Sequence, residues 1–273
     1  AIAPFVKDKA TDPAVVAVDE AGHFAVPLLS GHLGGANDLA RRIGRLCGAA
    51  PVITTATDGS GVFAVDEWAR YQNCAVVNKE AIKTVSGRLL AGERVRVRCP
   101  WPITGTAPEG VEQIGQEGAQ VCVNVYGDAD AGVLCLAPRI VALGLGCRKN
   151  TPHEVLEEAF AWMVRRSGVW EQAIFGAASI DVKENEPGLL AFCAAHGWPC
   201  RFFSAQALCA AAGTFTASAF VAQTVGVDNV CERSAVLCSG GTLLWRKETY
   251  RGVTMALAVA PWTPDWRWQD DGK

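Results

Sequence analysis

Two side chains near the start of the chain are candidates for moving protons. His32 lies inside a glycine-dense turn, Ser30–Gly35, and is the best placed of the four histidines, since histidine is the usual proton shuttle near neutral pH. Asp58 follows a hydroxyl-rich stretch that contains Thr55, and it could serve as a general base. An aspartate before Gly-Ser-Gly more often caps the following segment, so both roles stay open for Asp58.

The elements expected around this turn favour a binding site. The apolar run Phe24–Leu29 predicts a buried strand, and apolar spacing over Ala36–Cys47 predicts a helix that Gly48 would end. Strand, glycine turn and helix direct backbone N–H groups and the positive helix end at one spot, which suits a carboxylate or another anion. A tight connection without a ligand explains the turn equally well, because the nucleotide-binding glycine patterns are absent. The candidate binding residues are Ser30, Gly31, Gly34, Gly35, Asn37 and Thr55.

The same arrangement recurs later in the chain. The apolar run Ile140–Leu145 predicts a strand, GLGCRKNTP overlaps its end, and apolar residues at helical spacing come next. Arg148 and Lys149 lie in this turn, and two cations beside a helix N-terminus favour binding of a carboxylate or a phosphate. The alternative is a solvated pair of charges on a loop. The candidate binding residues are Gly144, Gly146, Arg148, Lys149 and Thr151.

Composition narrows the class of protein. Of the 273 residues, 50% are apolar and 19% are charged, which predicts a globular protein with about two domains. The net charge of −3 gives no reason to expect nucleic acid or a membrane surface as partner. No apolar run is long enough to span a membrane and no signal peptide opens the chain, so we expect a cytoplasmic protein. The 11 cysteines lack Cys-x-x-Cys spacing, which predicts reduced, buried thiols and no protein-bound metal.

The order of predicted elements gives an α/β fold class, with strand–glycine turn–helix units in two α/β domains and a small α+β segment between them. We expect an N-terminal α/β domain at residues 1–60, the middle α+β segment at 61–137, a C-terminal α/β domain at 138–262 and a loosely packed tail at 263–273. The chain begins with Ala1, in a stretch that reads like the end of a helix, so we expect the first domain to be incomplete at its start. Strands are expected at 15–18, 24–29, 51–55, 94–99, 119–125, 133–136, 140–145, 178–182, 201–203, 243–246 and 253–259.

Helix ends are predicted from their capping residues. Thr151 and Glu154 have the spacing of a capping box, with Pro152 at the first helical position. Pro187 is expected to open a helix that ends at His196. Helices are further expected at 65–71, 79–90, 205–212 with Ser204 as its cap, 218–224, and from the cap Asp228 to 237.

Several of these segments together resemble a known family. LLSGHLGGANDLARRI followed by PVITTATD, then GLGCRKNTP, SIDVKENEPGLLAFC and FVAQTVGVDNVCERSAVL, are similar in type and order to the cobalt-precorrin-5A hydrolase family of anaerobic cobalamin biosynthesis. The similarity runs from Ala1 to about Ala260 and is weakest over 62–136. The paired glycine motifs are specific in combination. Members of the family usually carry a further α/β stretch upstream of the position of Ala1.

The resemblance implies a hydrolase whose substrate is a cobalt-bearing, ring-contracted tetrapyrrole with a δ-lactone. Water opens the lactone, and the former meso carbon leaves with its methyl group as acetaldehyde. The cobalt belongs to the substrate, so no cofactor is expected on the protein. Within this reaction, His32 or Asp58 would be the base and the amides of Gly34 and Gly35 would be the oxyanion donors. Both glycine turns, with Arg148 and Lys149, would hold carboxylates of the macrocycle.

The sequence is also compatible with two other functions. A non-catalytic carrier of a corrinoid intermediate would bind pigment and release no acetaldehyde. A generic α/β enzyme acting on a phosphorylated metabolite would bind nucleotide or sugar phosphate, although neither glycine turn has the nucleotide pattern. The chain could also pair with itself or with other enzymes of the cobalamin pathway.

Overall fold

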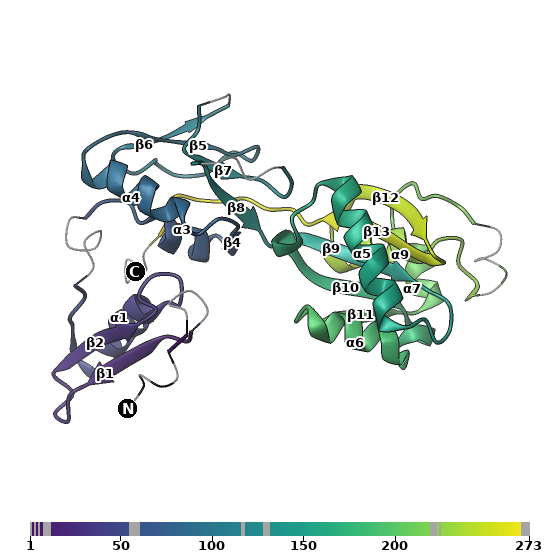
Figure 1. Cartoon of the computed structure of the whole chain (residues 1–273), viewed down its shortest axis with the longest axis horizontal. Helices are drawn as coiled ribbons and strands as arrows, with labels where there is room; N and C mark the ends of the chain where they lie inside the picture. Colours follow the sequence, from purple (N-terminus) through teal and green to yellow (C-terminus); the bar gives the residue numbers. More distant parts are fainter. Residues whose placement is uncertain are drawn as a thin grey trace. The chain divides into compact units, whose positions relative to one another are not determined.

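The computed structural model forms two compact units (Figure 1). It describes residues 2, 4, 6–7, 12–54, 61–115, 118–127, 132–218, 223 and 225–268. Unit 1 comprises Ala1–Val123, Ala129–Leu136 and Thr263–Lys273, and unit 2 comprises Asn124–Asp128 and Ala137–Trp262. The predicted domain boundaries at residues 60, 137 and 262 stay predictions. None of the described helices is long and apolar enough to cross a membrane.

The first part of unit 1 is a three-stranded sheet with one helix. Strands β1 (Val15–Val18) and β2 (Phe24–Leu29) are antiparallel, and β3 (Ala50–Pro51) pairs parallel with β2. Helix α1 (Ala36–Cys47) ends at Gly48, which has φ +77° and the left-handed conformation predicted for a helix stop. The expected strand at 51–55 was wrong in length, since β3 ends at Pro51, although the N–H of Val52 still donates to the carbonyl of Ala25 at 2.9 Å.

The rest of unit 1 contains a five-stranded sheet with the order β4-β8-β7-β5-β6. The pairs β5–β6, β5–β7 and β7–β8 are parallel. Strands β4 and β6 were not predicted, because runs of three or four residues carry too short a pattern to recognise. The elements are α3 (Val65–Tyr71), β4 (Cys74–Val76), α4 (Ala81–Leu90), β5 (Val95–Arg98), β6 (Val111–Ile114), β7 (Val121–Val123) and β8 (Leu134–Pro138).

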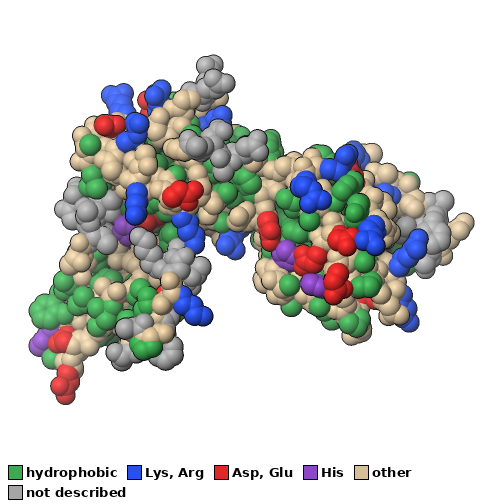
Figure 2. Space-filling view, in the orientation of Figure 1, with side chains coloured by type: hydrophobic (Ala, Val, Ile, Leu, Met, Phe, Trp, Pro, Cys, Tyr) green, Lys and Arg blue, Asp and Glu red, His purple; other side chains and the backbone are tan. Residues whose placement is uncertain are grey.

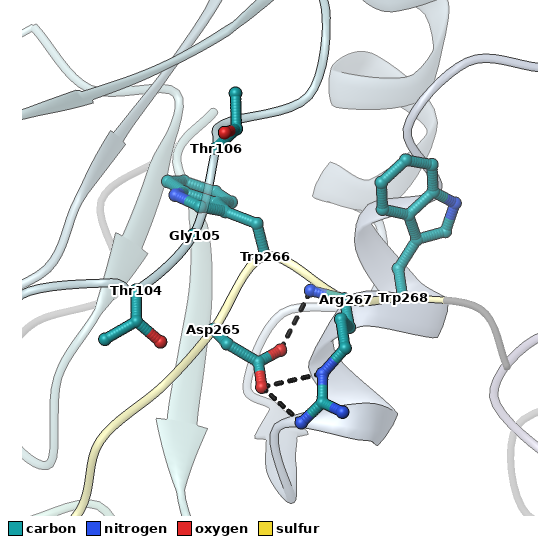
Figure 3. Close-up of a pocket in the computed structure, with 7 residues that line it drawn as sticks. All are labelled: Thr104, Gly105, Thr106, Asp265, Trp266, Arg267 and Trp268. Carbon is teal, nitrogen blue, oxygen red and sulfur yellow. Dashed lines mark hydrogen bonds and ion pairs between the residues drawn. The ribbon is translucent and has the colours of Figure 1, made fainter. Parts of the chain in front are cut away.

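The described end of the chain packs against unit 1. Trp266 is only 6% exposed, and its ring stacks on that of Trp68 with 5.4 Å between centroids. The indole N–H of Trp68 also donates a hydrogen bond to the carbonyl of Asp265 at 2.7 Å. Trp266 and Asp265 line a cavity of about 460 Å³, in which Arg267 pairs with Asp265 (Figure 3). The prediction of a loosely packed tail was therefore wrong for residues 263–268, because indole rings bury a large apolar area.

Unit 2 is built on a second five-stranded sheet, with the order β11-β10-β9-β13-β12. Strands β9, β10 and β11 are parallel, whereas β13 is antiparallel to β9 and β12 is antiparallel to β13. The predicted strand, glycine turn and helix are all present here. The elements are β9 (Val141–Gly146), α5 (His153–Ser167), η2 (Glu171–Ala173), β10 (Ile174–Ile180), η3 (Asp181–Lys183), α6 (Pro187–Ala195), β11 (Cys200–Phe203), α7 (Ala205–Ala210), α9 (Cys231–Ser239), β12 (Thr242–Tyr250) and β13 (Val253–Val259).

The core of unit 2 depends on close approach of α9 to the sheet. A Cβ on Gly144 of β9 would lie 1.8 Å from the carbonyl oxygen of Cys231 at the start of α9. Cys238, one helix length further on, packs against Ala142 and Ala178. Small residues on β9 and β10 therefore let α9 lie directly on the strands.

Some predicted caps are present and others are not. Ser204 caps α7 by accepting a hydrogen bond from the N–H of Ala207, and Pro187 opens α6, both as predicted. The capping box of Thr151 was wrong: Pro152 is the N-cap of α5, and the Thr151 hydroxyl donates to the carbonyl of Arg148. Asp228 does not cap α9 either, since it pairs with Arg233.

The cysteines are free thiols, as predicted. Cys47 and Cys209 are exposed, so for these two residues the prediction of burial was wrong. Burial raises the pKa of Cys99 to about 11, with smaller contributions from its neighbours. Such a buried thiol stays protonated and behaves as a small apolar side chain.

Candidate functional site

The first glycine turn is held together largely by its own backbone. The N–H of Gly35 donates to the carbonyl of His32, the N–H of Ala36 to that of Ser30 and the N–H of Asn37 to that of Gly31, each at 3.0 Å. The Gly35 N–H is thus engaged by the carbonyl of His32 in this structure, and its role as an oxyanion donor stays a prediction. The same role of the Gly34 amide likewise stays a prediction.

Close packing within the turn explains why its positions are occupied by glycine. A Cβ on Gly34 would lie 2.2 Å from the Cβ of Ser30, and one on Gly31 would lie 2.9 Å from Oδ1 of Asn37. Gly35 has φ +81° and precedes the first residue of α1. The compact geometry of the turn therefore accounts for these glycines without a ligand.

His32 contacts two acidic residues from α3. Its Nδ1 lies 3.0 Å from Oδ2 of Asp66, and its Nε2 lies 3.9 Å from Oε1 of Glu67. The side chains of His32, Asp66 and Glu67 are 16%, 11% and 1% exposed. Sequence analysis missed both acids. The signal was present in VDEWARY, where two acids stand between Val65 and Trp68 in a short, otherwise apolar helix start.

Further charged side chains surround this contact. Nδ2 of Asn37 donates to Oε1 of Glu67 at 3.3 Å, and a guanidinium nitrogen of Arg41 lies 3.8 Å from the same oxygen. Arg41 also pairs with Asp38 at 2.8 Å, and Arg70 pairs with Asp38 as well. Because buried acids cost desolvation energy and seldom serve packing alone, this cluster is a candidate functional site.

A small cavity lies beside the turn. Its volume is about 150 Å³, and Ser30, Gly31, Asn37 and Thr54 are among its lining residues. The structure thus brings three of the predicted binding residues together. Thr55 and Asp58 lie outside the described residues, so their predicted roles stay predictions.

Unit 2 contains a larger cavity of about 710 Å³. It lies at the carboxyl ends of the parallel strands β9 and β10, which end at Gly146 and Ile180, and the start of α9 borders it at Val230 and Cys231. This edge is where α/β sheets usually bind their ligands. Its lining includes the second glycine turn from Gly146 to Lys149.

Cations and apolar side chains line this cavity together. The lining includes Arg148 and Lys149 as predicted, and also Lys183 and Lys247, which sequence analysis missed. Lys183 ends η3, the short helix that follows the carboxyl end of β10, and that position was the available signal. Gly144 and Thr151 are not among the lining residues. Gly144 instead lies against the backbone of Cys231, which gives this glycine a packing role. Its role in binding stays a prediction.

One carboxylate, Glu186, faces these cations. Its Oε1 accepts a hydrogen bond from Nζ of Lys183 at 2.9 Å, and its Oε2 accepts one from the N–H of Asn150 at 2.8 Å. The hydrogen bond from Lys183 holds the pKa of Glu186 below its ordinary value of 4.5, and the Asn150 N–H adds to this effect. Glu186 is thus an ionised anchor that fixes Lys183 at the cavity.

Replacing Glu186 by glutamine should reduce the sensitivity of the protein to acid. Because the pKa of Glu186 is lowered in the folded state, its ionised form stabilises the fold above the ordinary value of 4.5, and this contribution is lost as pH falls through the lowered value. We expect Glu186→Gln to be less stable near neutral pH by on the order of 1 kcal/mol. Urea unfolding at a series of pH values measures the difference, which should shrink in acid. A difference that persists unchanged in acid would contradict this prediction.

Histidine and acidic side chains also gather on one face of unit 2 (Figure 2). His196 lies between Glu171, at 2.7 Å, and Glu157, at 3.1 Å, and His153 contacts Glu157 at 3.1 Å. His196 also stacks on Trp198. Among the described residues, however, no group of three or more His, Cys, Asp or Glu side chains has an arrangement that could hold a metal ion. These contacts instead join α5 to the end of α6.

Comparison with known proteins finds matching family models and relatives over most of the chain. Family models described as "Cobalamin synthesis G N-terminal", "Cobalamin biosynthesis central region" and "Cobalamin synthesis G C-terminus" match residues 1–58, 63–126 and 141–258. A cobalt-precorrin-5A hydrolase from Salmonella typhimurium is 35% identical over 273 residues, with 95% of this chain and 78% of the relative covered. The enzyme of the same name from Priestia megaterium is 29% identical, with 96% and 75% covered.

Solved structures show weaker similarity. A cobalamin biosynthesis protein G homolog from Sulfolobus solfataricus has a TM-score of 0.39 and 22% identity, with 95% of this chain and 78% of that chain covered. CobE, a protein from the cobalamin biosynthetic pathway, has a TM-score of 0.42 and 26% identity, with 46% and 93% covered. The assignment therefore depends on sequence similarity.

The three family models define a protein of cobalamin biosynthesis with N-terminal, central and C-terminal regions. Within that class, the chain belongs to the cobalt-precorrin-5A hydrolase family, as its identity to the Salmonella typhimurium enzyme shows. The predicted family is confirmed, and with it the prediction that the protein is a hydrolase.

Proposed function

We propose that the protein opens the δ-lactone of cobalt-precorrin-5A and releases acetaldehyde, which gives cobalt-precorrin-5B. The observation that carries this proposal is the cavity of unit 2, where Arg148, Lys149, Lys183 and Lys247 stand around an apolar wall. A tetrapyrrole with acetate and propionate arms needs both features, an apolar surface for the ring and cations for the arms.

The wall of this cavity suits a flat ring. The lining includes the apolar residues Ile180, Val182, Val225 and Val230, and Val182 is 64% exposed. The lining contains four cations and one carboxylate, Glu186, so it carries an excess of positive charge. Glu186 pairs with Lys183, which leaves the charges of the other three cations uncompensated by it. Carboxylates of the substrate supply the compensating charge.

The proposed reaction needs two proton removals. Water attacks the lactone carbonyl, and its proton goes to a base as the acyl C–O bond breaks, which leaves a carboxylate and an alcohol. When the alcohol loses its proton, its oxygen forms the carbonyl group of acetaldehyde. The C–C bond to the macrocycle breaks in that step, and its electron pair passes into the conjugated ring. His32 is the proposed base, since imidazole accepts and returns protons near neutral pH. The cobalt is part of the substrate, and no cofactor is proposed for the protein.

An anaerobic incubation with cobalt-precorrin-5A tests this function. Free acetaldehyde is assayed while the absorbance of protein-bound pigment is followed. Catalytic release of acetaldehyde supports the proposal. Bound pigment without acetaldehyde would contradict it and would favour a carrier, and absence of both signals would contradict binding as well.

Removing two cations from the cavity should weaken substrate binding. In the double variant Arg148→Ala, Lys149→Ala we expect KM to rise roughly tenfold or more, the size expected for one lost hydrogen bond to a charged group, with kcat little changed. Arg166→Ala is a matched control, because Arg166 is an exposed cation of the same unit that pairs with Glu248 and is not among the residues lining the cavity. Steady-state acetaldehyde release gives both constants. An equal KM in the double variant and the parent would exclude these two residues from binding.

A further inference from the structure

Asp66 makes a close contact with the imidazole of His32. Its Oδ2 lies 3.0 Å from Nδ1 of His32, which is within hydrogen-bond distance. The two residues are 34 positions apart in the sequence, so the contact is formed by the fold and not by the local turn. Both side chains are largely buried, at 11% and 16% exposure.

The orientation of Asp66 is itself fixed. Oδ1 accepts a hydrogen bond from the N–H of Glu67 at 3.2 Å, which leaves Oδ2 directed at His32. Asp66 is the second residue of α3, between Val65 and Trp68, which are both fully buried. A carboxylate on a packed helix is held more precisely than one on a loop.

The other acids of this cluster have different partners. Oε1 of Glu67, also on α3, lies 3.9 Å from Nε2 of His32, which is beyond hydrogen-bond distance, and it accepts from Asn37. Asp38 of α1 pairs with Arg41 and Arg70. The charged groups near His32 include Asp66 and Glu67, and Arg41 lies 3.8 Å from Glu67.

We propose that Asp66 is the positioning residue of the catalytic base: it accepts the Nδ1–H of His32, and so fixes the ring orientation and leaves Nε2 to take the proton. A carboxylate that accepts from one ring nitrogen selects the tautomer in which the other nitrogen carries the lone pair. This role rests on the proposed function of His32 as the base. It assigns Asp66 no direct contact with substrate.

The test compares two matched carboxylates. Asp66→Asn keeps the size of the side chain but offers an amide to the imidazole, whereas Asp19→Asn makes the same change at an aspartate outside this cluster, 3.7 Å from another histidine, His23. For each variant, kcat, KM and the pH profile of kcat are measured by acetaldehyde release. The ¹⁵N shifts of the four histidines are recorded where the rings are neutral, with His32→Gln used to assign the His32 signals.

We expect Asp66→Asn to lower kcat about 10²–10⁴-fold with KM within about twofold, because a misoriented or wrongly protonated imidazole is a poor base. Its pH profile should change shape, and Asp66→Glu should recover part of the loss. Asp19→Asn should keep kcat within about threefold of the parent. The parent should show the Nδ1–H tautomer of His32.

Two results would overturn the proposal. One is a kcat for Asp66→Asn as close to that of the parent as the kcat of Asp19→Asn, which would show that the Asp66 carboxylate has no part in catalysis. The other is an Nε2–H tautomer of His32 in the parent, which can be observed even if Asp66→Asn fails to fold. A parent that releases no acetaldehyde would refute the proposed function separately, and the tautomer would still decide whether Asp66 positions His32.

Discussion

Replacing His32 by glutamine should lower kcat for acetaldehyde release by about 10²–10⁴-fold while KM stays within about twofold. A base that acts in the chemical step stabilises the transition state and need not contribute to binding of the substrate in its ground state. Glutamine keeps a polar group beside Asp66, which lies 3.0 Å from the His32 ring, so the surrounding cluster need not collapse. Steady-state kinetics and pigment titration measure the two quantities separately.

His23→Gln is the matched control for this variant. His23 also lies near an aspartate, at 3.7 Å from Asp19, but its side chain is 73% exposed. We expect this variant to turn over at the parent rate. If His32→Gln also does so, His32 has no part in the mechanism. If pigment binding is lost together with kcat, the role of His32 is in binding.

Replacing Gly144 by alanine should destabilise unit 2 by about 3 kcal/mol, the upper part of the range for overpacking a core. The added methyl group would lie 1.8 Å from the carbonyl oxygen and 2.7 Å from the carbonyl carbon of Cys231. These are backbone atoms that cannot rotate aside, so α9 must move away from β9. Because Val230 and Cys231 also border the 710 Å³ cavity, we expect pigment binding to weaken in parallel.

Urea unfolding of the whole chain, followed by circular dichroism, measures this loss of stability. Gly87→Ala is the control, because Gly87 lies within α4 and a Cβ there would have no atom within 4 Å. That change should be neutral or stabilising by up to about 1 kcal/mol, since alanine favours a helix over glycine. An unfolding midpoint for Gly144→Ala equal to that of the parent would contradict the account of α9 packing.

The approximate placement of most helices and strands follows from the sequence alone. The spacing of apolar residues predicts α1 at its observed bounds, Ala36–Cys47, and Gly48 ends the helix as expected. The hairpin of β12 and β13 and the strand and glycine turn at β9 are equally local features. Apolar periodicity and glycine conformation act over a few residues, and for this reason a single sequence reveals them.

The candidate site itself could be predicted only in part. His32, Arg148 and Lys149 stand out because each lies in a glycine turn next to a helix start. The partners of His32 do not stand out, since Asp66 and Glu67 look like ordinary acids in the first turn of a helix. Lys183 and Lys247 likewise reach one cavity from η3 and β12.

The physical reason for this division is the range of the interactions. Turns, caps and helix stops are satisfied within a few residues, so their chemistry can be read along the chain. The contact between His32 and Asp66, the contact of Gly144 with α9 and the cation-lined cavity join residues 34 to more than 80 positions apart. Such contacts exist only once sheets and helices have packed, and packing also decides which acids are buried and which are exposed.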